Sequence, residues 1–146
     1  KPEQVTADIV IGENNPWRIA LEKQLASLPN MQLHVQSKNM ATLMQRAQLM
    51  LGAGGATHWE RCISALPGLV VTIAENQQAT TAYLDKQGAS IWLGNATELT
   101  ESLLIEKIGY YLKKPELLQA VATAASSVTP AGGGALAVVE ELLALQ

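Results

Sequence analysis

Hydrophobic and polar residues alternate along this chain with two different periods. Five short apolar runs are typical of strands, and they lie at residues 5–12, 31–35, 48–52, 69–73 and 89–93. Between them, apolar residues recur every three or four positions, which predicts helices at residues 17–28, 39–46, 57–66 and 76–87. Three more helices are predicted after the last strand, at residues 97–112, 115–125 and 135–145.

This order of elements predicts the fold class. Strands that alternate with helices through short connections form a parallel sheet with helices on both faces. Residues 69–73 (LVVTI) form a continuous apolar run, as in a strand that is buried on both faces. We therefore expect an α/β, Rossmann-like three-layer domain with a parallel sheet of about five or six strands. In such sheets, ligands bind at the carboxyl ends of the strands.

Composition narrows the class of protein further. A chain of 146 residues with 48% hydrophobic and 16% charged residues is typical of one globular domain. The net charge of −3 provides no basic field, so we expect no nucleic-acid partner. No apolar run approaches the roughly 20 residues of a membrane span, so we expect no membrane insertion. The single cysteine, Cys62, excludes an internal disulfide and agrees with a cytoplasmic location.

A glycine-rich segment follows the third predicted strand and leads into a helix. Its sequence is Gly52-Ala53-Gly54-Gly55-Ala56-Thr57. Glycines let the backbone approach a ligand closely, and the free N–H groups of a helix start favour an anion, so a phosphate is expected here. Thr57 and Glu60 also fit a T-x-x-E capping box, in which case the segment would only turn a strand into a helix. The spacing is not G-x-G-x-x-G and no P-loop lysine follows, so these residues alone predict a phosphate-binding α/β domain.

Two longer segments carry a more specific resemblance. Residues 51–67 (LGAGGATHWERCISALP) and 73–77 (IAENQ) resemble the UDP-sugar hydrolase family of pseudaminic acid biosynthesis, and more distantly the glycosyltransferase that completes the peptidoglycan lipid intermediate. Both have two domains of the glycosyltransferase type B architecture, and the C-terminal domain binds the UDP moiety. The resemblance implies that residues 1–146 are this single UDP-binding domain. The catalytic N-terminal domain would then be absent from this chain, which begins with Lys1.

The resemblance also implies a set of contacts to UDP or a UDP-sugar. The diphosphate would lie over four consecutive residues, Gly54, Gly55, Ala56 and Thr57, and the ribose hydroxyls would bind Glu60. The remaining contacts fall in three short segments: Ser37, Lys38 and Met40 near the uracil, Asn76 and Gln77 facing the sugar, and Gly12 and Asn14 in a wall of the interdomain cleft. No catalytic residue, metal or cofactor is expected in this chain.

Other reactive or aromatic side chains have simpler interpretations. For His58, a position facing solvent is favoured over a contact with phosphate. For Arg61, a contact with phosphate and an interdomain or surface ion pair are equally expected. Cys62 is expected to be a small buried residue, and Trp17 and Trp59 to pack in or near the core. Two histidines and one cysteine, far apart in sequence, make a zinc site improbable.

Three functions remain open at this point. The first is the nucleotide-binding domain of a UDP-sugar hydrolase that releases UDP and a free diacetamido-trideoxy hexose for nonulosonic acid biosynthesis. The second keeps the fold but replaces water with an acceptor, as in a UDP-sugar glycosyltransferase. The third is a nucleotide-sugar-binding module without catalysis. The WERC and AENQ segments favour hydrolysis, and an N-terminal domain with a glycine-rich loop and a histidine would separate an enzyme from a module.

Overall fold

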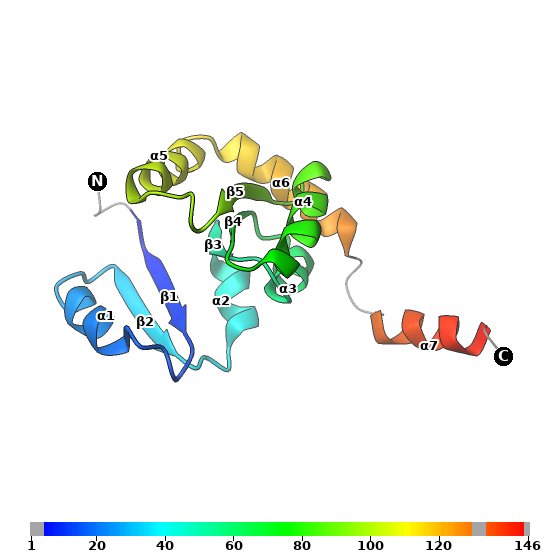
Figure 1. The fold of residues 1–146 in the computed structure, drawn as a ribbon, viewed down its shortest axis with the longest axis horizontal. Coiled ribbons are helices and arrows are strands. Elements are labelled where there is room, and N and C mark those ends of the chain that lie inside the picture. The colour runs from blue at the N-terminus through cyan, green and yellow to red at the C-terminus, as the bar shows by residue number, and fades with distance from the viewer. Residues whose placement is uncertain (1–4, 130–133, 145–146) are drawn as a thin grey trace. The chain divides into compact units, whose positions relative to one another are not determined.

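The computed structural model describes residues 5–129 and 134–144, and the chain divides into two compact units, one ending at Leu43 and the other beginning at Met44 (Figure 1). Every predicted strand and helix is present, and the strands within each sheet are parallel. The predicted α/β, Rossmann-like class is therefore confirmed. Each unit is described separately below.

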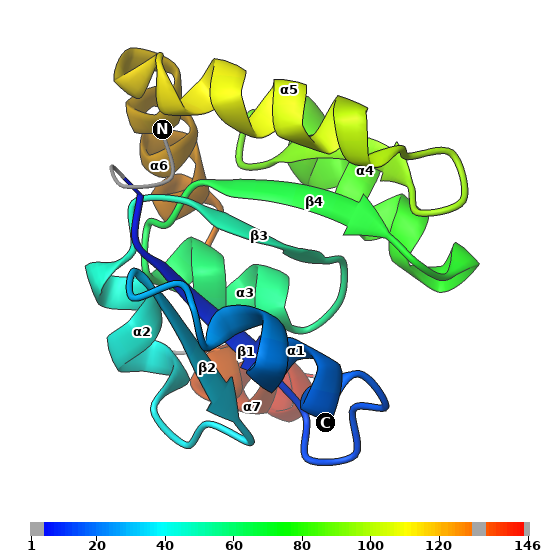
Figure 2. The same cartoon turned by 90° about the vertical axis from the view of Figure 1, so that its left-hand side faces the viewer.

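The first unit is built on a pair of parallel strands. β1 (Ala7–Ile11) runs beside β2 (Met31–Val35), with Ala7 opposite Met31 and Ile11 opposite Val35. The strands are joined by α1 (Arg18–Leu25), which packs on β2 (Figure 2). Along β1, half-buried residues alternate with exposed ones, as the apolar–polar alternation predicts. The following helix, α2 (Met40–Arg46), spans the division between the units.

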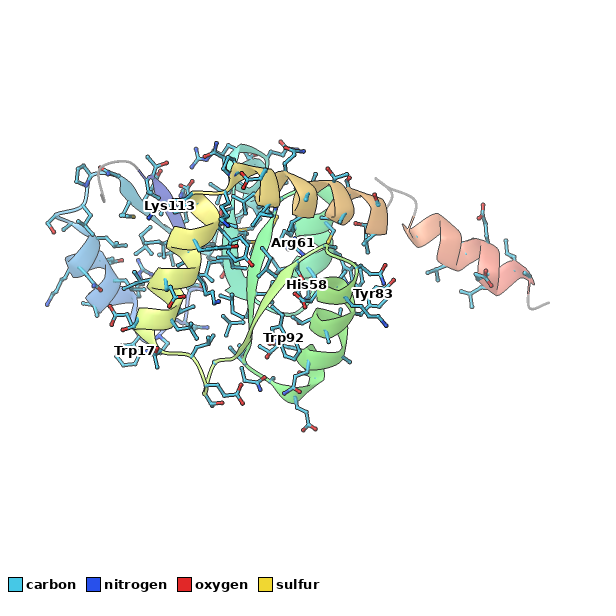
Figure 3. All side chains as sticks on the ribbon, turned by 90° about the horizontal axis from the view of Figure 1, so that it is seen from above. Trp17, His58, Arg61, Tyr83, Trp92 and Lys113 are labelled. Carbon is cyan, nitrogen blue, oxygen red and sulfur yellow. The ribbon has the colours of Figure 1, made fainter. Side chains whose placement is uncertain are left out.

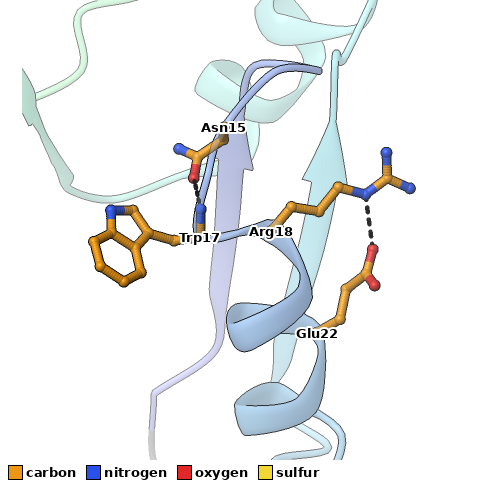
Figure 4. Close-up of polar contacts among 4 residues, drawn as sticks. All are labelled: Asn15, Trp17, Arg18 and Glu22. Atoms are coloured by element: carbon orange, nitrogen blue, oxygen red, sulfur yellow. Dashed lines mark hydrogen bonds and ion pairs between the residues drawn. The ribbon is translucent and has the colours of Figure 1, made fainter.

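The start of α1 differs from its prediction in one respect. The Asn15 side-chain carbonyl accepts a hydrogen bond from the Trp17 N–H at 2.9 Å, and Arg18 pairs with Glu22 one turn further on (Figure 4). Trp17 is the N-cap residue and is 69% exposed, so its predicted place in or near the core is wrong. Trp17 comes before the first helical residue, Arg18, and apolar periodicity does not distinguish an N-cap position from a helical one.

The second unit is a three-layer α/β/α arrangement. Its elements are β3 (Met50–Ala53), α3 (Thr57–Ile63), β4 (Gly68–Thr72), η2 (Glu75–Gln77), α4 (Gln78–Lys86), β5 (Ile91–Asn95), α5 (Glu101–Leu112) and α6 (Pro115–Val128). Helix α5 lies on one side of the strands, and α3 and α4 lie on the other (Figures 1 and 3). β4 is the central strand and is almost entirely buried, as its continuous apolar run predicts.

The strands form two sheets, β1–β2 and β3–β4–β5, and not one sheet of five or six strands. The described residues hold five strands, so no sixth strand is found in that part of the chain. Alternating periodicity identifies strands and their direction, but the partner along each edge depends on tertiary contacts that this pattern does not encode.

The core of the second unit consists of small and medium-sized side chains. Cys62, Leu84, Ala89 and Ala125 are fully buried together. Thr100 caps α5 by accepting the Leu103 N–H at 3.2 Å, so α5 begins four residues later than predicted. The chain continues into α7 (Gly134–Ala144). Among the described residues, no helix is both long and apolar enough to cross a membrane.

Candidate functional site

The glycine-rich segment forms a tight connection from β3 to α3. The Gly54 N–H still belongs to the strand edge, because it donates to the Val71 carbonyl at 3.0 Å. Gly55 then adopts a φ of +141°, a conformation that side-chain-bearing residues rarely adopt, and Ala56 is the N-cap of α3. The helix therefore begins at Thr57, as the sequence predicts.

Three consecutive backbone N–H groups are left open at this turn. Within the part of the chain that the structure describes, the N–H groups of Gly55, Ala56 and Thr57 donate to no protein acceptor. The next two are satisfied, because His58 donates to the Gly55 carbonyl at 3.0 Å and Trp59 donates to the Ala56 carbonyl at 3.1 Å. Successive open N–H groups form a concave anion site, so this loop provides the backbone chemistry of a phosphate cradle.

The capping-box interpretation of this segment is wrong. Ala56, not Thr57, is the N-cap, and no side chain caps the helix. Among the described residues, the exposed Glu60 carboxylate accepts no hydrogen bond, whereas its backbone carbonyl accepts from Ser64. Thr57 and Glu60 are three residues apart in α3 and therefore lie on one face of the helix. The carboxylate is thus left free one turn beyond the open N–H groups.

Another part of the α3 surface is buried, and two of its three residues are polar. His58, Arg61 and Cys62 are at most 2% exposed. His58 and Arg61 are labelled in Figure 3. The solvent-facing position expected for His58 is therefore wrong, because its Nε2 lies 3.0 Å from the Thr81 hydroxyl. The expected buried position of Cys62 is confirmed. Trp59 is 42% exposed, so its predicted place in or near the core is wrong as well.

Arg61 has a structural position in place of either predicted role. Its Nη1 donates to the Leu66 carbonyl at 2.8 Å and to the Ala89 carbonyl at 2.9 Å. In the described part of the chain, no carboxylate pairs with it and its buried Nε has no partner. The guanidinium also packs against Gly68, where an added Cβ would lie 2.6 Å from Arg61 Cδ and Nε. Arg61 therefore joins the end of α3 to the start of β5 and does not face the loop.

Burial shifts the pKa of each group on this face. Desolvation lowers the pKa of His58, and the nearby Arg61 charge lowers it further. Desolvation also lowers the pKa of Arg61. It raises the pKa of the Cys62 thiol, with Arg61 acting in the opposite direction. His58 and Cys62 are therefore held in their neutral forms.

Residues from the end of β4 approach the loop after β3. Gln77 lies in η2, where its side-chain carbonyl accepts the Ile73 N–H at 2.9 Å. A Cβ placed on Gly54 would lie 3.2 Å from Gln77 Cβ, so Gln77 adjoins the loop directly. Asn76 is exposed in the same 3₁₀ turn. The structure thus brings the residues expected to face the diphosphate and the sugar to neighbouring carboxyl ends of parallel strands.

A polar network beside this site is absent from the sequence prediction. The Asn95 side-chain oxygen accepts from the Thr72 hydroxyl at 2.7 Å and from Gln78 Nε2 at 3.2 Å. Trp92 Nε1 lies 3.2 Å from the same Thr72 hydroxyl. Asn95 ends β5 as the glycine loop ends β3, so its place after an apolar run is a signal that was available in the sequence.

The remaining predicted residues lie in the first unit. Gly12 and Asn14 follow β1, and Ser37, Lys38 and Met40 follow β2. The ends of the two strands are joined, because the Gln36 N–H donates to the Ile11 carbonyl at 2.9 Å and its side-chain oxygen accepts from the Glu13 N–H. Ser37 accepts the Asn39 N–H at 3.2 Å, which shapes the approach to α2. These residues therefore lie in the segments that follow the carboxyl ends of β1 and β2, up to the first residue of α2.

No group of three His, Cys, Asp or Glu side chains suited to a metal ion occurs among the described residues. The open N–H groups follow the carboxyl end of β3, and parallel α/β sheets bind their ligands at this edge. Residues 6–133 match the glycosyltransferase family 28 C-terminal domain, so the chain belongs to that family.

Individual proteins agree with this assignment. The chain is 30% identical over 96 residues to the spore coat polysaccharide biosynthesis protein SpsG of Bacillus subtilis, covering 66% of this chain but only 28% of that protein. The fold is similar to WaaG, a glycosyltransferase involved in lipopolysaccharide biosynthesis, with a TM-score of 0.66, 19% identity and coverage of 88% of this chain and 35% of WaaG. It is also similar to MurG of Acinetobacter baumannii, with a TM-score of 0.61, 23% identity and coverage of 85% of this chain and 38% of MurG. The glycosyltransferase type B fold is therefore confirmed, and the chain spans a minor part of each protein.

Proposed function

We propose that this chain is the domain that binds the nucleotide diphosphate of a UDP-sugar, within a longer enzyme of polysaccharide or surface-sugar biosynthesis. The main support for this proposal is the run of open N–H groups at Gly55, Ala56 and Thr57. Three backbone donors on one tight turn suit a phosphate oxygen, and they cost little reorganisation because the turn is already formed. Membership of the family gives independent support.

Glu60 is assigned to the ribose. Its carboxylate is exposed and on the same face of α3 as Thr57. A carboxylate accepts hydrogen bonds from two vicinal hydroxyls, so Glu60 suits the sugar that adjoins the diphosphate in a nucleotide. Asn76 and Gln77 are assigned to the transferred sugar, and the contacts of Ser37, Lys38, Met40, Gly12 and Asn14 stay predictions from the sequence.

For the reaction of the whole enzyme we propose hydrolysis, with release of UDP and a free diacetamido-trideoxy hexose. The proposal depends on the resemblance of the WERC and AENQ segments. Glycosyl transfer is the second candidate, and membership of a glycosyltransferase family favours it. Another domain of the proposed longer enzyme would supply the base in either reaction, while this chain stabilises charge on the departing diphosphate.

Calorimetric titration of the 146-residue chain with UDP tests the binding proposal. Glu60→Gln should weaken UDP binding by about tenfold or more, since hydrogen bonds to a charged group contribute about 1.5–3 kcal/mol. Glu106→Gln, which changes an exposed carboxylate on α5, is the matched control and should leave the affinity unchanged. No heat of binding with UDP at millimolar concentration, or equal affinities for wild type and Glu60→Gln, would contradict the assignment.

A second experiment decides the reaction. The full-length protein is incubated with a UDP-sugar, and the products are separated with and without candidate acceptors. A free hexose formed in equal amount to UDP without any acceptor supports hydrolysis. UDP formed only when an acceptor is present supports transfer and contradicts the hydrolase proposal.

A further inference from the structure

Three side chains from different elements meet beneath the first residue of the loop. A Cβ placed on Gly54 would lie 2.7 Å from the Thr81 hydroxyl, 3.2 Å from Gln77 Cβ and 3.3 Å from His58 Nε2. His58 comes from α3, Gln77 from η2 and Thr81 from α4. His58 and Thr81 are at most 2% exposed, so these contacts form a buried floor under the loop.

The hydrogen bonds of this floor run in one direction. The Thr81 hydroxyl lies 2.7 Å from the Gln77 backbone carbonyl, which only accepts, so the single hydroxyl proton points to that carbonyl. The same oxygen lies 3.0 Å from His58 Nε2, and with its proton already used it acts there as an acceptor. His58 must therefore carry its proton on Nε2, and the chain runs from His58 through Thr81 to the backbone of Gln77.

Gln77 is fixed at its side chain as well. Its amide oxygen accepts the Ile73 N–H at 2.9 Å, which assigns the Nε2 group as the outward donor. Nε2 lies 4.0 Å from a Cβ placed on Gly55, so it is beside the open N–H groups of the loop. Within the described residues, this Nε2 donates to no acceptor. A free, oriented donor thus stands at the edge of the phosphate cradle.

We infer that His58 is a positioning residue of the donor site: through the buried Thr81 hydroxyl it holds Gln77 so that the Gln77 Nε2 group donates to an oxygen of the bound sugar. The inference rests on the proposed function for its ligand, and on the hydrogen-bond geometry for the positioning. It assigns roles to His58 and Thr81, neither of which needs to touch the ligand.

The electrostatic surroundings of His58 agree with this role. Burial and the neighbouring Arg61 charge both lower the pKa of His58, so the imidazole is neutral near pH 7. A neutral imidazole has one donor and one acceptor nitrogen, and Thr81 requires the donor on Nε2. The Arg61 guanidinium is itself occupied by the Leu66 and Ala89 carbonyls and does not compete for Thr81.

The positioning is tested on the 146-residue chain by NMR, without any ligand. Long-range ¹H–¹⁵N spectra should show the Nε2–H tautomer of His58. The two Gln77 side-chain amide protons should give one well-resolved pair of resonances with nuclear Overhauser contacts to Gly55. Thr81→Val removes the hydroxyl and should shift and average that pair, whereas Thr81→Ser keeps the hydroxyl and should preserve it. An Nδ1–H tautomer, or a Gln77 pair unchanged by Thr81→Val, would overturn the inference.

Ligand binding then separates this inference from the proposed function. UDP and UDP-N-acetylglucosamine are titrated into wild type, Thr81→Val, His58→Leu and His58→Gln, each checked for folding by circular dichroism. Thr81→Val and His58→Leu should weaken UDP-N-acetylglucosamine binding by about three- to tenfold and leave UDP binding within about twofold. His58→Gln retains a hydrogen-bond donor and should bind UDP-N-acetylglucosamine with an affinity close to that of wild type. Wild type that binds neither nucleotide contradicts the proposed function. Wild type that binds both, with variants that do not discriminate, contradicts the role of His58.

Discussion

Gly54→Ala is the substitution for which the structure gives the most direct quantitative expectation. The added methyl group would lie 2.7 Å from the Thr81 hydroxyl, well inside van der Waals contact. Thr81 is completely buried and is held by hydrogen bonds on two sides, so it has no free direction in which to move. The Gln77 Cβ at 3.2 Å and the His58 Nε2 at 3.3 Å close the remaining space.

The cost follows from two opposing contributions. Forcing an extra methyl group into a packed site costs about 1–3 kcal/mol. Replacing glycine by alanine also restricts the unfolded chain, which returns about 0.4–1 kcal/mol. We therefore expect Gly54→Ala to lower the free energy of unfolding by about 1–2 kcal/mol, equivalent to roughly 2–8 °C in melting temperature for a chain of this length.

Urea unfolding followed by circular dichroism measures this difference. Gly109→Ala is the matched control, because Gly109 lies within α5 and an added Cβ meets nothing within 4 Å. A glycine in the middle of a helix is unfavourable relative to alanine, so the control should be more stable than wild type by about 0.5–1 kcal/mol. The two alanine variants should therefore change stability in opposite directions.

A double variant tests whether the contact with Thr81 causes the loss. Thr81→Ala removes the hydroxyl that the new methyl group would strike, so Gly54→Ala should cost less in that background. A coupling energy of about 0.5 kcal/mol or more is expected for residues in contact. Gly54→Ala with wild-type stability, or with the same cost in both backgrounds, would refute the packing argument.

Three further predictions concern the same unit. The pKa of His58 is lowered in the folded state, so the unfolded chain takes up a proton first as the pH falls. The free energy of unfolding, measured in urea, should therefore decrease as the pH drops from about 7.5 through the unfolded pKa near 6.5. His58→Gln should show a weaker decrease over the same pH range. Arg61→Ala should lower the free energy of unfolding by about 2–5 kcal/mol, because it leaves a cavity and two carbonyls without a donor, whereas a loss below about 0.5 kcal/mol would show that the guanidinium is not a structural link. Gly55→Ala should cost about 1–2 kcal/mol through its φ of +141° alone, measured by thermal unfolding, with an unchanged melting temperature as the contrary result.

Local patterns were sufficient for the elements of this fold but not for the partners of its strands. The period-two run located β1 closely because half-buried and exposed residues alternate along it, and β2 was located although it alternates only over its first three residues. The same runs could not show that the strands form two sheets, since an apolar run does not specify its neighbour. The start of α5 was placed too early because Thr100 marks the cap by one side-chain hydrogen bond, and not by apolar periodicity.

The candidate site was predictable where glycine and chain order determine it. The loop after β3 and the start of α3 at Thr57 follow from the glycines and the strand that precedes them. The burial of His58 and Arg61 was not predicted, because both are polar and hydrophobic periodicity assigns polar residues to the surface. The two residues are three positions apart and therefore share one helical face. Their buried polar groups are paired by tertiary hydrogen bonds to Thr81 and to the Leu66 and Ala89 carbonyls, which the sequence pattern does not reveal.

The close packing of Arg61 on Gly68 places a joint constraint on two positions that are seven residues apart. A side chain at position 68 is incompatible with the buried arginine, because an added Cβ would lie 2.6 Å from Arg61 Cδ and Nε. A smaller residue at position 61 would leave the Leu66 and Ala89 carbonyls unsatisfied but would make room at position 68. Across related sequences we therefore expect the two positions to vary together, with arginine at 61 accompanied by glycine at 68 and larger residues at 68 found only where arginine is lost.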